Sequence, residues 1–145
     1  MKATVFITSL ILAVGLAACG SSKDATSTEQ KDIPKAELVD DFSSYRDNAA
    51  VNIQSILIKG NLMTIHVNYS GGCEKHEFKL LGSKMLEKTM PPKRGVTLYH
   101  DNKGDSCREL VDEILVFDIT ALGISKQEVI LMIDGHETPH PYKAP

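Results

Sequence analysis

The sequence predicts an all-β domain: a small antiparallel β-sandwich of the immunoglobulin-like kind, with six or seven strands and one disulfide. The first observation is a series of short runs in which apolar and polar residues alternate. The clearest run places Met63, Ile65, Val67 and Tyr69 on one side. The second observation is that glycine, asparagine and aspartate clusters separate these runs at short intervals. No helical pattern is long enough to supply the crossover helices of a parallel α/β sheet.

The elements follow in chain order. Residues 34–46 carry Leu38, Phe42 and Tyr45 at helical spacing, which predicts either a short helix or an irregular segment docked on the domain. From Val51 onward the apolar period is two. The strands expected from it are 51–58, 63–69, 76–81, 96–100, 110–119 and 129–133, with 140–142 as a short edge strand. The connections include a long loop at 82–95 and a link at 120–127 with at most one helical turn.

Residues 1–18 have the pattern of a secretory signal peptide. A positively charged start precedes an apolar run of about a dozen residues, which is too short to span a bilayer as a permanent helix. The run ends in Leu16-Ala17-Ala18-Cys19, which resembles the lipobox of bacterial lipoproteins. In that family the segment before the cysteine is cleaved and the thiol takes a diacylglycerol. The resemblance therefore implies that Cys19 is the lipidated N-terminus; the alternative is an ordinary signal peptide with a chance cysteine.

Residues 19–32 are expected to form the lipidated N-terminus and a flexible tether, because Gly20 to Asp32 includes no large apolar side chain. The β-sandwich domain then comprises residues 33–145. Acyl chains would hold the protein at the membrane. The residue after the cysteine is not the aspartate associated with inner-membrane retention in Gram-negative lipoproteins, so the resemblance favours the outer membrane. A formal net charge of −3 at pH 7 argues against a nucleic-acid partner.

Cys73 and Cys107 are the only cysteines outside the leader. Exported chains enter an oxidising space in which paired thiols become disulfides. Lipid would consume Cys19, so one intramolecular pairing remains. We therefore expect a Cys73–Cys107 disulfide that contributes about 3–4 kcal/mol by restricting the unfolded chain.

His76 and His100 are the candidate ligand site. Each is in phase with the apolar residues of its own predicted strand, so both rings should point to the buried side. A structural role is expected, in which each ring bonds a neighbouring carbonyl or carboxylate beneath the disulfide. The alternative is a tetrahedral zinc set of Cys73, His76, His100 and Cys107, although oxidised cysteines cannot bind zinc as thiolates.

The sequence has no nucleophile elbow, no phosphate-binding glycine loop and no helix-borne metal motif, so it predicts no catalytic residue and no cofactor. The mature chain resembles bacterial envelope lipoproteins with a Gly-Gly-Cys segment, here Gly71-Gly72-Cys73, and a second cysteine after an Asn-Lys-Gly-Asp turn. That resemblance implies no activity. We expect a non-enzymatic, membrane-anchored module that binds or scaffolds an envelope protein. The alternative is metal or small-ligand binding through His76 and His100.

Overall fold

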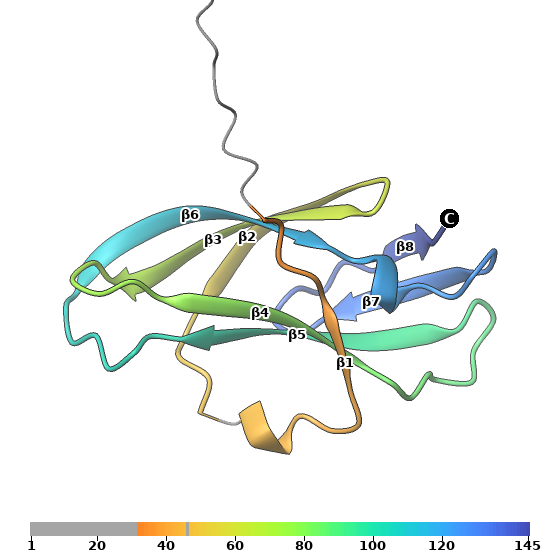
Figure 1. Cartoon of the computed structure of the whole chain (residues 1–145), viewed down its shortest axis with the longest axis horizontal. Coiled ribbons are helices and arrows are strands. Elements are labelled where there is room, and N and C mark those ends of the chain that lie inside the picture. The colour runs from red at the N-terminus through yellow and green to blue at the C-terminus, as the bar shows by residue number, and fades with distance from the viewer. Residues whose placement is uncertain (1–31, 46) are drawn as a thin grey trace, which may run out of the picture. The chain divides into compact units, whose positions relative to one another are not determined.

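The computed structural model describes residues 32–45 and 47–145 (Figure 1). The predictions for the signal peptide, for Cys19 and for most of the tether lie outside these residues. The elements of the described part are β1 (Glu37–Val39), η1 (Ser43–Tyr45), β2 (Asn52–Lys59), β3 (Leu62–Gly71), β4 (Glu77–Ser83), β5 (Lys93–Asp101), β6 (Glu109–Asp118), η2 (Thr120–Leu122), β7 (Glu128–Ile133) and β8 (His140–Lys143). Both helices are three-residue 3₁₀ turns. Neither is long and apolar enough to cross a membrane.

The strands form two sheets that pack face to face, which confirms the all-β sandwich (Figure 1). One sheet has the order β1-β4-β5-β7-β8 and the other has the order β2-β3-β6. The described part has eight strands instead of six or seven. The β1–β4 and β5–β7 pairs are parallel, so the larger sheet departs from the purely antiparallel, immunoglobulin-like arrangement expected. The chain between the two members of each parallel pair crosses to the other sheet before it returns.

The core lies between the sheets, and β3 shows why the sequence folds this way. Its residues alternate between buried and partly exposed, and Met63, Ile65 and Val67 are completely buried. The β2–β3 hairpin turns at Gly60, whose φ of 58° favours glycine. Facing apolar residues from the larger sheet, such as Leu98, complete the core. The period-two pattern therefore identified both the strand and its buried face.

Two segments differ from expectation. In place of the short helix or irregular docked segment expected at 34–46, the described residues 34–45 contain β1, which pairs with β4, and the single 3₁₀ turn η1. The predicted loop at 82–95 is shorter, since β5 begins at Lys93. Arg94 is buried, and its Nε donates to the carbonyl of Leu122 at 2.7 Å while Nη1 donates to the carbonyl of Ser83. Burial lowers the pKa of this guanidinium. A buried arginine satisfied by carbonyls leaves no trace in apolar periodicity.

Candidate functional site

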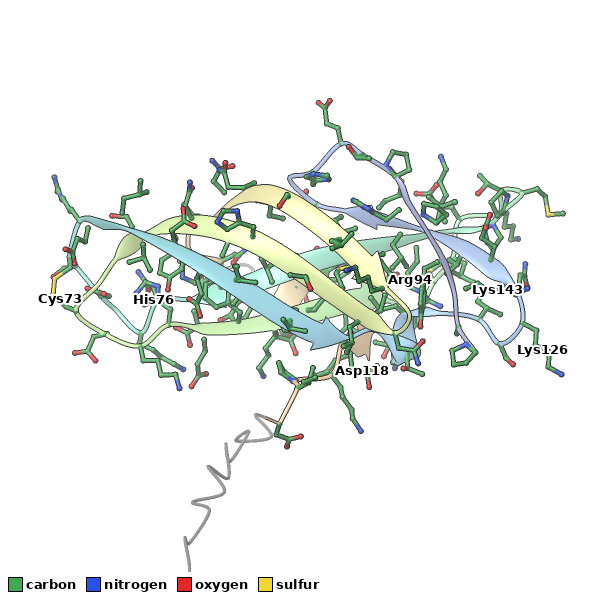
Figure 2. All side chains as sticks on the ribbon, turned by 90° about the horizontal axis from the view of Figure 1, so that it is seen from above. Cys73, His76, Arg94, Asp118, Lys126 and Lys143 are labelled. Atoms are coloured by element: carbon green, nitrogen blue, oxygen red, sulfur yellow. A yellow bond between two sulfur atoms is a disulfide. The ribbon has the colours of Figure 1, made fainter. Side chains whose placement is uncertain are left out.

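The disulfide joins two loops at one end of the sandwich. Cys73 follows β3 and Cys107 precedes β6, and their sulfur atoms are bonded at 1.87 Å with the Cα atoms 5.9 Å apart. Figure 2 shows Cys73 and His76 at this end, with Lys126 and Lys143 toward the opposite one. The pairing expected from cysteine count and export is confirmed.

The glycine pair before Cys73 allows the end of β3 to lie against a buried ring. A Cβ on Gly71 would lie only 2.5 Å from Cε1 of His76, so any side chain there would displace the imidazole. Gly72 has a φ of +108°, and a Cβ there would lie 2.7 Å from Oε2 of Glu109. Close approach explains the first glycine, and backbone conformation together with close approach explains the second.

His76 and His100 contact each other inside the domain. Their exposed fractions are 7% and 1%, so both rings lie on the buried side that strand phase predicted. Nδ1 of His76 lies 2.7 Å from Nε2 of His100. Nδ1 of His100 lies 3.3 Å from the carbonyl oxygen of Ala49 and 3.2 Å from that of Ala50. The contact therefore joins the residue that precedes β4 to β5, and His100 also fixes the segment that enters β2.

Asp105 is the acidic partner that the sequence interpretation did not assign. Its Oδ2 lies 3.1 Å from Nε2 of His76, and both side chains are 1% exposed. Its carboxylate also accepts backbone N–H bonds from Cys107, Glu74 and Cys73 at 2.8, 3.0 and 3.0 Å. These amides, Cys107 first, and the bond from His76 hold the pKa of Asp105 well below its usual range. The signal that was available is its position two residues before a cysteine in a tight turn.

The hydrogen-bond partners determine how many protons the two rings hold. Ala49 and Ala50 offer carbonyl oxygens, which only accept, so Nδ1 of His100 carries a proton. Asp105 offers a carboxylate, so Nε2 of His76 carries a second proton. The bond between Nδ1 of His76 and Nε2 of His100 uses one further proton, so the alanine carbonyls, the two rings and the carboxylate of Asp105 form one continuous hydrogen-bonded network.

Aromatic rings enclose the pair. Phe78 stacks on His100 with centroids 4.5 Å apart and an angle of 8°. Tyr69 lies 4.6 Å from His76 and 4.9 Å from His100 between centroids. Its hydroxyl donates to Oε2 of Glu113 at 2.7 Å; burial and this carboxylate raise the pKa of Tyr69 to about 12. This enclosure keeps water from the histidines and favours a structural role.

The arrangement of these residues bears on two chemical roles, metal binding and hydrolysis. Zinc binding by Cys73, His76, His100 and Cys107 would need the disulfide reduced and the bond between the two rings broken. Asp105 and the two sulfur atoms lie close enough to share an ion, but those sulfurs are in the disulfide. A hydrolytic triad is not assembled, because Oγ of Ser70 donates to the carbonyl of Cys107 and both nitrogens of His76 face other groups.

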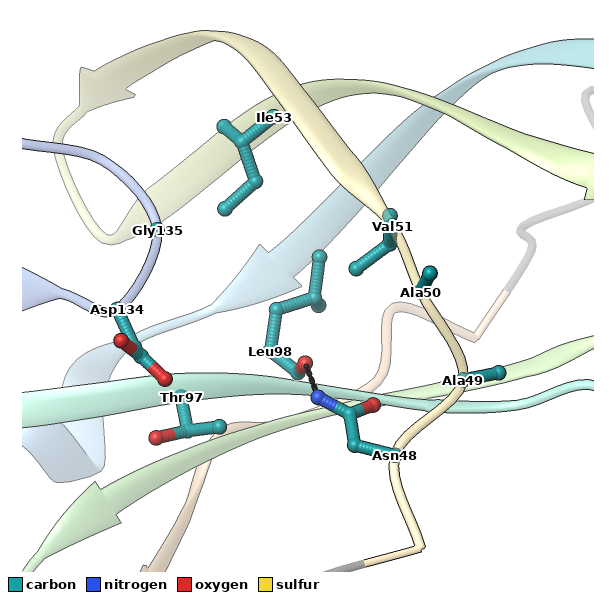
Figure 3. Close-up of a pocket in the computed structure, with 9 residues that line it drawn as sticks. All are labelled: Asn48, Ala49, Ala50, Val51, Ile53, Thr97, Leu98, Asp134 and Gly135. Carbon is teal, nitrogen blue, oxygen red and sulfur yellow. Dashed lines mark hydrogen bonds between the residues drawn. The ribbon is translucent and has the colours of Figure 1, made fainter.

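A small cavity of ≈ 230 Å³ is lined partly by Ala49 and Ala50, whose carbonyls lie against His100 (Figure 3). Asn48 joins the two features, because its Nδ2 donates to the carbonyl of Leu98 while its Oδ1 accepts the backbone N–H of His100. Thr97 and Asp134 supply the other polar atoms of the lining. Sequence reasoning did not find this cavity, since its walls come from β5, the entry to β2 and the turn after β7.

Acidification should destabilise the domain. Burial, and next the charge of His76, hold the pKa of His100 below its usual value. As the pH falls below about 6.5, His100 therefore binds a proton in the unfolded chain before it does so in the folded domain. This contribution is complete above about pH 6.5 and is lost as the pH falls, by at most about 1.4 kcal/mol per pH unit for each such group. Burial and the charge of His136 lower the pKa of His140 too, so His140 adds to the same loss.

Urea unfolding between about pH 6 and pH 4.5 measures this effect. His140→Gln should remove only the share of His140 and leave that of His100. Because the pKa of Asp105 is also lowered, a second loss should follow below about pH 4. A free energy of unfolding that stays constant down to pH 4.5 in the His140→Gln protein would contradict the assignment to His100.

Residues 35–136 match the family model described as the NigD-like C-terminal beta sandwich domain. No curated protein matches the chain. One similar crystal structure is that of a NigD-like immunity protein from Bacteroides caccae, with 20% identity, a TM-score of 0.55 and coverage of 76% of this chain and 58% of that one. Another is a protein of unknown function from Bacteroides vulgatus, with 17% identity, a TM-score of 0.50 and coverage of 78% and 58%.

At these identities the two crystal structures establish similarity of fold alone. The chain spans 58% of the length of each, so its relatives carry segments that it does not match. The family model, in contrast, covers most of the chain, from Lys35 before β1 to His136 after β7. The chain therefore belongs to the family defined by the NigD-like C-terminal β-sandwich domain.

Proposed function

We propose that this protein is a non-enzymatic, lipid-anchored binding protein of the cell envelope that acts as an immunity protein, neutralising a toxic polypeptide by binding it. Family membership supports this proposal, together with the immunity protein among its structural relatives. Immunity proteins act by tight association with their target and need no catalytic group. The relative spans more sequence than this chain, so its role is carried over here as a hypothesis.

The observation that carries the proposal is the contrast between the inside and the outside of the sandwich. Among the described residues, every buried side-chain nitrogen and oxygen has a hydrogen-bond partner. The histidines and Asp105 are thus occupied in holding the fold together. Several of the largest exposed apolar side chains of the described part are on one sheet, namely Leu57, Leu62, Leu110 and Ile114. A disulfide-linked domain with exposed apolar side chains on one sheet is suited to recognising another protein.

Anchoring through Cys19 makes a direct prediction. Cells that express the full chain in the presence of a labelled fatty acid should incorporate the label, because the lipobox-like segment ends at that cysteine. The Cys19→Ala variant should lose the label and accumulate as the uncleaved precursor. Fractionation on a density gradient should place the wild-type protein in the outer membrane. Label that persists in the variant would exclude lipidation at Cys19.

The immunity role can be tested by deleting the gene in the bacterium that encodes it. A deletion strain grown with its parent should be inhibited if the parent releases the toxin that this protein neutralises. The wild-type gene should restore survival, and Cys19→Ala shows whether anchoring is required. Equal growth of deletion and parent strains, in mixed culture and in parental supernatant, would argue against the proposal.

The second candidate is metal or small-ligand binding through His76 and His100, and the close approach of their ring nitrogens supports it. That function requires the internal bonds to open. A chelator should then lower the melting temperature of protein purified without metal stripping. An unchanged melting temperature favours the structural role.

A further inference from the structure

Strand β6 presents an open edge of the smaller sheet. The strand order β2-β3-β6 gives it one neighbour only. On its other side, the segment before β1 reaches only the last residue, where Asp118 accepts the backbone N–H of Ala36 and donates its own to the carbonyl of Pro34. The remaining residues of β6 have no strand on that side among the described parts of the chain.

The direction of these bonds identifies which backbone groups are exposed. Since N–H and C=O groups alternate sides along a strand, the residues of β6 in phase with Asp118 also face outward. The register agrees, because Leu62 opposite Asp118 turns its own backbone toward Lys59 across the hairpin. The outward residues are Leu110, Asp112, Ile114 and Val116. At about 3.4 Å per residue this segment is about 20 Å long, enough for a strand of five to seven residues.

The same residues place their side chains on the solvent face of the sheet. Leu110 is 75% exposed and Ile114 is 66% exposed. Across the sheet, Ile114 is opposite His66 and Val116 is opposite Thr64, whose other neighbour is Leu57. An added strand would therefore meet apolar side chains and free backbone groups together, which are the two components of recognition by strand addition.

Other sheet edges are less suitable. In the larger sheet, β1 has only three residues, and β8 has four, with a proline at Pro141. Short edges and proline are common means of blocking strand addition. In the smaller sheet, β2 changes register between Ile53 and Ser55. Strand β6 pairs with β3 along its whole length without any such shift.

The charge of β6 indicates what could bind there. Its four charged residues are all acidic: Glu109, Asp112, Glu113 and Asp118. A second copy of this strand would bring like charges together, which disfavours self-association through this edge. A segment with lysine or arginine between apolar residues would match both the charges and the exposed side chains.

We propose that the β6 edge binds an extended segment of the partner polypeptide, with alternating apolar and basic residues, by adding it as a strand. This inference rests on the proposed function, because it specifies the surface and the kind of partner for the same binding role. Backbone pairing supplies the common part of the affinity, and Asp112, the acidic residue among those that face outward, supplies the preference for basic side chains.

The test uses the lipidated protein in mild detergent and a fluorescent nine-residue peptide of alternating valine and lysine. The peptide should bind, and amide exchange in residues 109–118 should slow on binding. Ile114→Pro should weaken binding by about tenfold, since it removes an outward N–H and disturbs the peptide's pairing with the neighbouring residues of the edge. It leaves the β3–β6 hydrogen bonds intact, and proline is tolerated at an edge. Ile114→Thr, which keeps the N–H, should bind far better than the proline variant.

A matched pair of variants tests the contribution of charge to binding. Asp112→Lys should weaken binding, whereas Glu128→Lys on β7 should leave it unchanged, because β7 has neighbours on both sides. A peptide with N-methyl groups on alternate amides keeps its charge but should fail to bind, which preserves the test if Ile114→Pro does not fold. Protection of residues 109–118 that appears with protein concentration alone would instead identify a second copy as the occupant and overturn the proposal.

The outcome separates this inference from the immunity role. If the deletion strain is sensitive but wild type and Ile114→Pro restore it equally, and the peptide does not bind, the function stands and the β6 edge is wrong. If the peptide binds at β6 while the deletion strain grows normally, the edge stands and the immunity role is wrong. If neither N-methylation of the peptide nor Ile114→Pro changes binding, the peptide is held by charge attraction alone. That result would overturn the proposal that it adds to β6 as a strand.

Discussion

A chain with serine at both Cys73 and Cys107 is expected to lose about 3–4 kcal/mol of unfolding free energy relative to the oxidised protein. The bridged residues are 34 apart in sequence, so the disulfide removes considerable freedom from the unfolded chain. Small domains have a total stability of about 5–15 kcal/mol, which makes this loss a large share. The double variant should still fold at room temperature, with a melting temperature well below that of the oxidised protein.

Urea unfolding at neutral pH measures the difference, and a reducing agent should bring the wild-type protein close to the double variant. Ser106→Ala, an exposed change in the same loop, is the matched control and should shift stability by less than about 0.5 kcal/mol. Intact mass should be about two units lower before reduction than after, as one disulfide requires. Free thiols in the native oxidised protein, or a loss below about 1 kcal/mol in the variant, would contradict this prediction.

The Cys73–Cys107 disulfide could be predicted from the sequence because the prediction needed only a count of cysteines and an export signal. Apolar alternation likewise predicted β3 and its buried face, and it placed the rings of His76 and His100 inside. These features depend on local period, which a single chain displays directly. The fold class followed from the number of such strands and from the turns between them.

Features that depend on long-range pairing could not be read in the same way. Asp105 is 29 residues from His76 in sequence, and nothing local shows that the two meet. Apolar residues on both faces are typical of a central strand, yet β6 is an edge strand, because sheet order is set by pairing across the domain and not by the strand itself. Arg94 is in the range 82–95 that the sequence predicts to be a loop, and only the carbonyls of Leu122 and Ser83 explain its burial.

His76→Ala is expected to lower the free energy of unfolding by about 1–3 kcal/mol. The change removes the hydrogen bonds to Nε2 of His100 and to Oδ2 of Asp105. Both partners then remain inside the domain without a hydrogen bond from residue 76. It also empties the space between the ring of Tyr69 and the backbone of Gly71. Urea unfolding at pH 7 gives the value. His66→Ala is the matched control, because His66 pairs with Asp112 on the surface and should contribute less than about 1 kcal/mol.

A double-mutant cycle then tests whether the two rings act as one unit. His100→Ala alone should also destabilise, since it removes the bonds to the carbonyls of Ala49 and Ala50. The double variant should cost less than the two single losses combined, by about 0.5–3 kcal/mol, because both single changes break the same ring-to-ring bond and each leaves one polar ring unsatisfied. Additive losses would show that the rings do not share a proton. A chelator that destabilises the wild-type protein but not His76→Ala would instead assign the pair to a metal ion.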